Sequence, residues 1–146
     1  MISDIATYGA LFASAFLAAT IVPAQSEIGL AYLVSQQNHH LLALLCVASL
    51  GNITGALVNW YLGVMCARYQ GRVWFPIKAE KLARATSWFQ TYGKWSLLLS
   101  WVPIIGDPIT VAAGVLRTPF WTAFILISLA KTARYCVIIG LTIVYL

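Results

Sequence analysis

Charged residues are scarce in this sequence, and their scarcity excludes most classes of soluble protein. Only 9% of the 146 residues are charged, four of them acidic, while 61% are hydrophobic. Soluble domains carry about 25% charged residues. The composition therefore predicts an integral membrane protein. At about 20 residues per span, a single transmembrane domain over 1–146 has room for four to six hydrophobic segments.

Cysteine pairs and catalytic motifs are also missing. The three cysteines, Cys46, Cys66 and Cys136, have no CxxC spacing, which argues against a disulfide framework and a metal site. The chain has no GxSxG or HExxH motif and no nucleophile beside a histidine. An acid/base pair of Glu27 and Asp107 acting on a lipid is the remaining enzymatic alternative. We expect a protein that is not an enzyme and that has no cofactor.

Basic residues are concentrated in one stretch. Between positions 68 and 94 the only acid is Glu80, and the bases are Arg68, Arg72, Lys78, Lys81, Arg84 and Lys94. The positive-inside rule predicts a cytoplasmic connector over about 66–93. Within it, 78–92 has the spacing of an amphipathic helix, with apolar positions at Leu82, Ala85, Trp88 or Phe89, and Tyr92. Anionic lipid explains this stretch, so we expect no nucleic-acid partner.

Two apolar segments are interrupted in the same way. Pro23 and Glu27 recur 80 positions later as Pro103 and Asp107. Proline interrupts a helix, and matching interrupted segments in two halves indicate a transporter site. We expect broken or re-entrant hairpins over 5–36 and 94–116, the second interrupted by Pro103, Gly106 and Pro108.

Each hairpin is followed by a segment long enough for a full span, at 41–64 and 120–145. Repeat 1 then covers about 5–65 and repeat 2 about 94–146. An odd number of crossings on each side of the connector predicts opposite orientations, hence an inverted repeat, with both termini outside. In the first span, Gly51 and Gly55 form a GxxxG pattern that allows close helix packing, and Asn52 adds a polar group.

Four charged residues lie deep in apolar sequence: Glu27, Asp107, Lys131 and Arg134. A charge in hydrocarbon costs about 2.5–3.5 kcal/mol on insertion scales. The four residues could therefore form structural ion pairs. They could instead line a polar cavity, with the carboxylates carrying protons and Lys131 and Arg134 binding a phosphate.

The chain resembles the DedA family of membrane proteins, also called the VTT or SNARE-associated domain, and most closely its short YqaA-like branch. The resemblance rests on VPAQSE (22–27), GNITG (51–55), Tyr92-Gly93, SWVPIIGDP (100–108), AGVLR (113–117) and KTARY (131–135). It implies a bacterial inner-membrane protein with two facing re-entrant hairpins. It also implies translocation of lipid phosphates, notably undecaprenyl phosphate, or a role in membrane homeostasis.

One departure from the family changes the expected headgroup site. The main DedA branch carries an RFxPxxR pattern in the second hairpin, whereas Ser100 and Gly106 occupy the two arginine positions here. We therefore expect Lys131 and Arg134, with Arg117 as a further candidate, to bind the headgroup. In the first hairpin Glu27 matches the acidic position of the family, and Ala24 replaces its usual glycine.

The sequence thus predicts an all-helical, multi-pass inner-membrane protein that transports or flips an anionic lipid phosphate, either undecaprenyl phosphate or a phospholipid. Glu27 and Asp107 would couple transport to protons, and Pro23, Asn52, Pro103 and Gly106 would shape the hairpins and cavity. The alternative is a membrane-organising protein without transport, whose buried charges are structural. Membrane lipids are the expected partners, and the sequence is compatible with a homo-oligomer.

Overall fold

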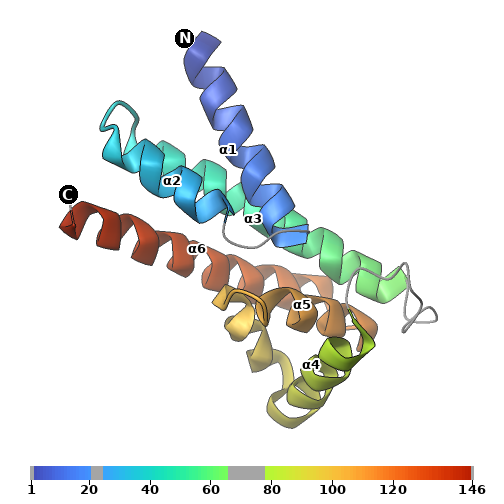
Figure 1. Ribbon diagram of the computed structural model, residues 1–146. Coiled ribbons are helices and arrows are strands. Elements are labelled where there is room, and N and C mark those ends of the chain that lie inside the picture. Colours follow the sequence, from blue (N-terminus) through green and yellow to red (C-terminus); the bar gives the residue numbers. More distant parts are fainter. Residues whose placement is uncertain (1, 21–24, 66–77, 146) are drawn as a thin grey trace. The chain divides into compact units, whose positions relative to one another are not determined.

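The computed structural model describes residues 2–20, 25–65 and 78–145, and most of these residues are helical (Figure 1). In chain order they are α1 (Ile2–Thr20), α2 (Gln25–Ser35), α3 (Leu41–Met65), α4 (Ala79–Tyr92), the 3-10 helix η2 (Gly93–Trp101), α5 (Gly106–Val115) and α6 (Phe120–Val144). The all-helical prediction is confirmed for these ranges. Pro23, Cys66, Arg68 and Arg72 lie outside the described residues.

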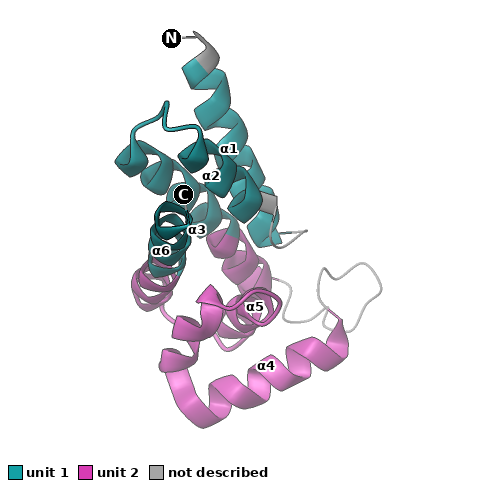
Figure 2. Cartoon of the chain, turned by 60° about the vertical axis from the view of Figure 1, so that its left-hand side comes forward, with its two compact units in different colours: residues 1–55, 131–146 teal, residues 56–130 magenta. Residues whose placement is uncertain are grey.

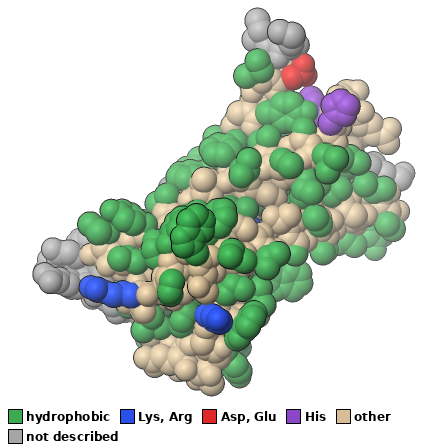
Figure 3. Space-filling model, turned by 180° about the vertical axis from the view of Figure 1, so that it is seen from behind, with side chains coloured by type: hydrophobic (Ala, Val, Ile, Leu, Met, Phe, Trp, Pro, Cys, Tyr) green, Lys and Arg blue, Asp and Glu red, His purple; other side chains and the backbone are tan. Residues whose placement is uncertain are grey.

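Among the described residues, two helices are long and apolar enough to cross a membrane. They are α3 and α6, each 25 residues long. They confirm the helices predicted at 41–64 and 120–145 to within one residue. Large apolar side chains stay exposed on both, among them Leu42 and Trp121, and hydrophobic side chains are spread over the face drawn in Figure 3. Exposed apolar surface of this extent suits a lipid environment.

The chain divides into two compact units (Figure 2). Unit 1 comprises residues 1–55 and 131–146, and unit 2 comprises residues 56–130. Leu30, Leu44 and Tyr135 are fully buried in the core of unit 1. Leu97, Ile109 and Ile127 are fully buried in the core of unit 2. The predicted inverted orientation of the two repeats stays a prediction.

In unit 1 the GxxxG pattern of α3 brings its backbone close to α1. A methyl group added at Gly55 would lie 2.7 Å from both the Phe16 carbonyl oxygen and the Ala19 Cβ. One added at Gly51 would lie 3.0 Å from the Ala15 Cβ. The two glycines therefore permit the close helix contact that the sequence predicted, and α1 is the neighbouring helix.

In unit 2 the predicted amphipathic helix is α4. Leu82, Ala85 and Phe89 are its buried residues, so Phe89 rather than Trp88 continues the apolar stripe. The helix ends at Tyr92 and is capped by Gly93, whose φ of 66° lies in the left-handed region and whose N–H donates to the Phe89 carbonyl. Glycine is the residue that adopts this conformation without a steric cost.

The second broken segment is interrupted between η2 and α5. Val102 is extended, as expected for a residue before proline. The Ile105 N–H then donates to the Pro103 carbonyl at 2.8 Å, which closes a γ-turn around Ile104 at φ 73°. This form of γ-turn is rare and strained, more so for a β-branched residue. Pro108 does not interrupt the segment as predicted, because it lies in the first turn of α5, where a missing N–H costs little.

Hydroxyl side chains on the helices bond back to carbonyls one turn earlier. Thr54 Oγ1 donates to the Leu50 carbonyl at 2.6 Å, and Thr142 Oγ1 donates to the Ile138 carbonyl at 2.8 Å. Ser14, Ser35, Thr20, Thr91 and Thr110 do the same. These groups are satisfied within their own helix.

Candidate functional site in unit 1

An ion pair joins α2 to α6. Glu27 lies in the first turn of α2, where the positive end of the helix dipole favours a carboxylate. Its Oε1 pairs with Nη2 of Arg134 on α6, and the two side chains are 25% and 13% exposed respectively. Two of the four charges singled out in the sequence are therefore brought together, and largely removed from solvent.

A buried hydrogen-bond network lies at neighbouring positions on the same helices. The Asn52 amide on α3 donates to the Tyr135 hydroxyl on α6 at 2.8 Å. The Tyr135 hydroxyl is also 3.0 Å from the Ser26 hydroxyl on α2. Because the tyrosine oxygen accepts from Asn52, its own proton can be donated to Ser26. This network links α2, α3 and α6 through side chains that are at most 3% exposed.

The Asn52 side chain has one polar atom left over. Its Oδ1 is buried and accepts no hydrogen bond from the described protein residues. A buried acceptor without a donor costs about 1–3 kcal/mol. The amide oxygen is therefore a position where a water or a ligand hydroxyl could donate.

Lys131 lies three positions before Arg134, so the two cations share one face of α6. Lys131 is 2% exposed. Unit 1 thus has two buried or largely buried cations on one helix face, and Glu27 pairs with Arg134. Such an arrangement can bind a phosphate through charge-assisted hydrogen bonds, with the guanidinium in bidentate geometry.

The remaining predicted residues lie in unit 2 and are not part of this ion pair. Asp107 is half-buried in the first turn of α5. Gly106 packs against the backbone of Ser100, where an added Cβ would be 3.0 Å from the Ser100 Cα. Pro103 is exposed in the turn between η2 and α5.

Arg117 has a defined backbone role at the end of α5. It is exposed, with φ of 54°, and its N–H donates to the Gly114 carbonyl at 2.9 Å. The next N–H, of Thr118, reaches the Ala113 carbonyl at 2.9 Å. These two bonds form a Schellman cap with Arg117 at the left-handed position.

Sequence reasoning missed Ser26 and Tyr135 as members of the site. Each stands directly beside a charged residue that was identified, Ser26 before Glu27 and Tyr135 after Arg134. That adjacency is the signal that could have identified them. No set of three metal-ligating side chains lies close enough to bind a metal ion within residues 2–20, 25–65 and 78–145.

Comparison with known proteins places the whole of this arrangement within one family. The VTT domain matches residues 6–144. The chain is 34% identical over 135 residues to the inner membrane protein YqaA of Escherichia coli strain K12, covering 91% of this chain and 89% of the relative. It is also 34% identical over 143 residues to an uncharacterized protein of Haemophilus influenzae, covering 93% of this chain and 87% of that one. No solved structure matches the chain.

Proposed function

The chain belongs to the VTT-domain family of membrane proteins, also called the DedA family, and we propose that it moves an anionic lipid phosphate across a bacterial inner membrane. The proposed cargo is undecaprenyl phosphate or a phospholipid, carried without chemical change. The name of the Escherichia coli relative, an inner membrane protein, supports the location, and the two long apolar helices support insertion in a bilayer.

The single observation that carries this proposal is the Glu27–Arg134 ion pair in unit 1. Ionisable residues within membrane helices are rare and usually mark a pathway or a binding site. Two charges away from water gain little net stability from pairing, since their desolvation offsets much of their attraction. A functional reason for retaining them is therefore needed.

We propose that the lipid phosphate and Glu27 compete for Arg134. A guanidinium has five N–H donors, so it can bind two phosphate oxygens side by side once the carboxylate leaves. Lys131, on the same face of α6, adds a second positive charge. The released Glu27 carboxylate can then accept a proton, which couples headgroup binding to proton uptake.

Asp107 is the proposed second proton carrier, because it lies in the first turn of α5 as Glu27 lies in the first turn of α2. Arg117 is a weaker candidate for headgroup binding than Lys131 and Arg134. Its capping geometry already accounts for its position at the end of α5. Re-entrant hairpins in an inverted repeat, meeting around one site, complete the proposal.

The test is transport by the full chain in lipid vesicles. Movement of a fluorescent anionic lipid phosphate and of a fluorescent phosphatidylcholine, which is zwitterionic, would be measured with and without a pH gradient. The proposal expects selective, gradient-dependent movement of the anionic lipid. Glu27→Gln should abolish the dependence on the gradient, and Arg134→Lys should reduce selectivity because it removes the bidentate fork. Equal movement of both lipids by every variant would refute it.

A second candidate is a membrane-organising protein without transport. The network of Ser26, Tyr135 and Asn52 favours it, because those bonds tie three helices of unit 1 together. The charge-reversed variant Glu27→Arg/Arg134→Glu separates the two functions. A structural pair should tolerate reversal, with folding and vesicle behaviour both kept. A transport site should fold but lose phosphate selectivity, since the cation has moved from α6 to α2.

A further inference from the structure

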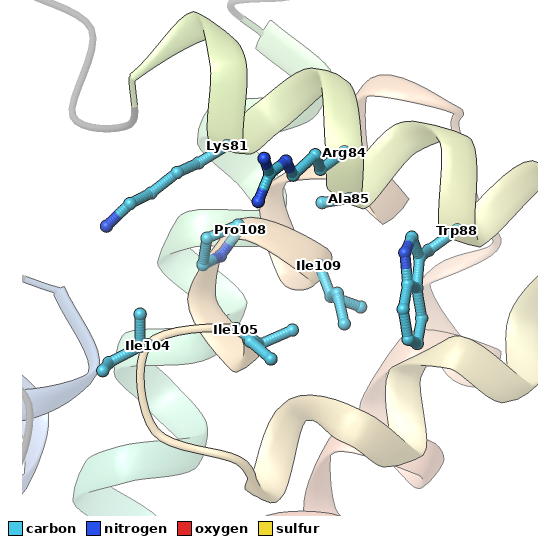
Figure 4. Close-up of a pocket in the computed structure, with 8 residues that line it drawn as sticks. All are labelled: Lys81, Arg84, Ala85, Trp88, Ile104, Ile105, Pro108 and Ile109. Atoms are coloured by element: carbon cyan, nitrogen blue, oxygen red, sulfur yellow. The ribbon is translucent and has the colours of Figure 1, made fainter.

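A cavity of about 260 Å³ lies between α4 and α5 in unit 2 (Figure 4). Lys81, Arg84, Ala85 and Trp88 line it from α4. Their spacing places them on one face of that helix. The other wall consists of three isoleucines and a proline from the turn before α5 and from its first residues. This cavity shares no residue with the Glu27–Arg134 site.

The cationic residues and the aromatic ring that line the cavity lie at opposite ends of it. Figure 4 shows the charged ends of Lys81 and Arg84 on the side of Pro108, and the Trp88 ring on the opposite side beside Ile109. The remaining lining residues, Ala85, Ile104 and Ile105, are apolar. The site therefore has a cationic end and a hydrocarbon end, as an amphiphile with an anionic head has.

Arg84 is available for a phosphate. Its contact within the helix is an ion pair with Glu80 at 3.5 Å, in which the side chains are 80% and 82% exposed. Exposed pairs at this spacing contribute little and are screened by salt. A phosphate can replace the Glu80 carboxylate with better geometry, because it accepts two parallel N–H bonds from the guanidinium.

Part of the apolar wall comes from a strained turn. Ile104, at φ 73°, is 63% exposed, and the following Ile105 is 48% exposed. A β-branched residue in the left-handed region is strained, and such strain tends to mark a functional segment. Here the turn presents two large aliphatic side chains at the cavity instead of burying them.

We propose that this cavity retains one anionic phospholipid, with its phosphate on Lys81 and Arg84 and part of one acyl chain against Ile105, Ile109 and Trp88. Cavities that enclose drug-sized ligands measure about 300–1,000 Å³, so this one suits part of a chain and not a whole lipid. The retained lipid is bound, not carried, and the inference stands apart from the proposed transport.

The first experiment measures lipid binding by the full chain in detergent. Native mass spectrometry would follow phosphatidylglycerol and phosphatidylcholine binding. The unmodified protein should hold one phosphatidylglycerol about tenfold more tightly than phosphatidylcholine, a difference of about 1.4 kcal/mol. Lys81→Gln/Arg84→Gln should remove that preference. Both side chains are exposed, and the single variants, each expected to lose part of it, replace the double variant if it fails to fold.

The matched control removes the same charge from the same segment. Lys78 and Lys94 flank α4, are exposed and do not line the cavity. Lys78→Gln/Lys94→Gln should keep the tenfold preference. An equal loss in both double variants would mean general attraction to anionic lipid and would overturn the site.

The acyl-chain half of the site has its own test. Ile105→Trp should fill the cavity and weaken binding of phosphatidylglycerol at least about tenfold, although both cations remain. Leu98→Trp, on η2 and outside the cavity lining, should not. Added sodium phosphate should fail to displace the lipid. Full displacement by phosphate alone, or unchanged binding in Ile105→Trp, would show an anion site without an acyl chain and overturn the proposal.

Discussion

The helix α2 in unit 1 and the helix α5 in unit 2 follow the same local plan. Each has an acid in its first turn, Glu27 and Asp107, 80 positions apart. Two positions after its last residue, each is followed by a residue in the left-handed region, Gln37 at φ 52° and Arg117 at φ 54°, also 80 positions apart. In both, that residue's N–H donates to the carbonyl three positions earlier. The repeat in the sequence is thus a repeat in backbone conformation.

The side chains around the two helices differ. In α2 the buried residues Ser26, Leu30 and Val34 form one stripe, while Ile28 is 72% exposed. In α5 eight of the ten residues are buried. The same backbone plan therefore serves a one-sided helix in unit 1 and a core helix in unit 2. Backbone repetition can be maintained while the surroundings diverge.

The largest effect should come from adding a methyl group to α5. Gly114→Ala would place its Cβ against the Trp60 carbonyl oxygen and 3.0 Å from the Gly63 Cα. These are backbone atoms that cannot move aside, so we expect a loss of about 3 kcal/mol or more in unfolding free energy. Gly29→Ala in α2 is the control. Nothing lies within 4 Å of its added Cβ, so a gain of about 0.5–1 kcal/mol is expected.

Thermal unfolding of both variants in one detergent measures this contrast. Equal effects in α2 and α5 would contradict the difference in burial between the two helices.

The next effect concerns the ion pair of α2. Arg134→Ala leaves Glu27 largely buried without its cation, and we expect a loss of about 2–3 kcal/mol, less than for fully buried pairs. Glu27→Leu/Arg134→Leu removes both charges and should recover much of that loss. Unfolding in detergent again provides the measurement. A double variant less stable than Arg134→Ala would show that the charges themselves stabilise unit 1.

A smaller effect is expected at the hydrogen-bond network. Tyr135→Phe removes the acceptor of the Asn52 amide and the partner of Ser26. The expected loss is about 1–2 kcal/mol, because two buried polar groups are left unsatisfied. Tyr145→Phe, at a side chain that is 86% exposed, should change nothing. Identical unfolding curves for the two variants would show that the network does not stabilise the fold.

The smallest expected effect is a stabilisation, and its size should differ between the turn after α2 and the turn before α5. Ile104→Gly relieves a β-branched residue at φ 73° and should stabilise the lipid-free protein by about 1 kcal/mol. Gln37→Gly, at φ 52°, should gain less, about 0.5 kcal/mol, because glutamine has no β-branch. A larger gain at Gln37 than at Ile104 would remove the argument that the turn in unit 2 is the strained one.

Sequence reasoning succeeded where the signal was local. The spans at α3 and α6 follow from long apolar runs, and α4 follows from its three- and four-residue spacing. Tyr135 could not be found in this way, since its partners Ser26 and Asn52 lie 109 and 83 positions away along the chain. The proline at 103 predicted an interruption, but nothing about Ile104 predicts a positive φ, because isoleucine normally avoids it.

The pairing of Glu27 with Arg134 was one of the arrangements left open by the sequence. The signs of the charges limit which residues can form ion pairs. Only the packing of α2 against α6 determines that Glu27 pairs with Arg134. The close approach of Gly63 and Gly114 was missed for a similar reason. A small-residue pattern within one helix is visible in a sequence, whereas two glycines on different helices are recognised only once the helices meet.

Hydroxyls bonded to their own helices, such as those of Thr54 and Thr142, alter how the chain partitions into a bilayer. A residue-by-residue hydrophobicity scale assigns each of them the unfavourable transfer free energy of a polar group in hydrocarbon. In this chain, however, the hydroxyl proton is already donated to a carbonyl. The segments that the insertion machinery of the cell receives are therefore more hydrophobic than their amino-acid sequence suggests. Replacing Thr54 by valine should leave membrane integration almost unaltered, while the same change at Ser26 removes a hydroxyl that serves a neighbouring helix.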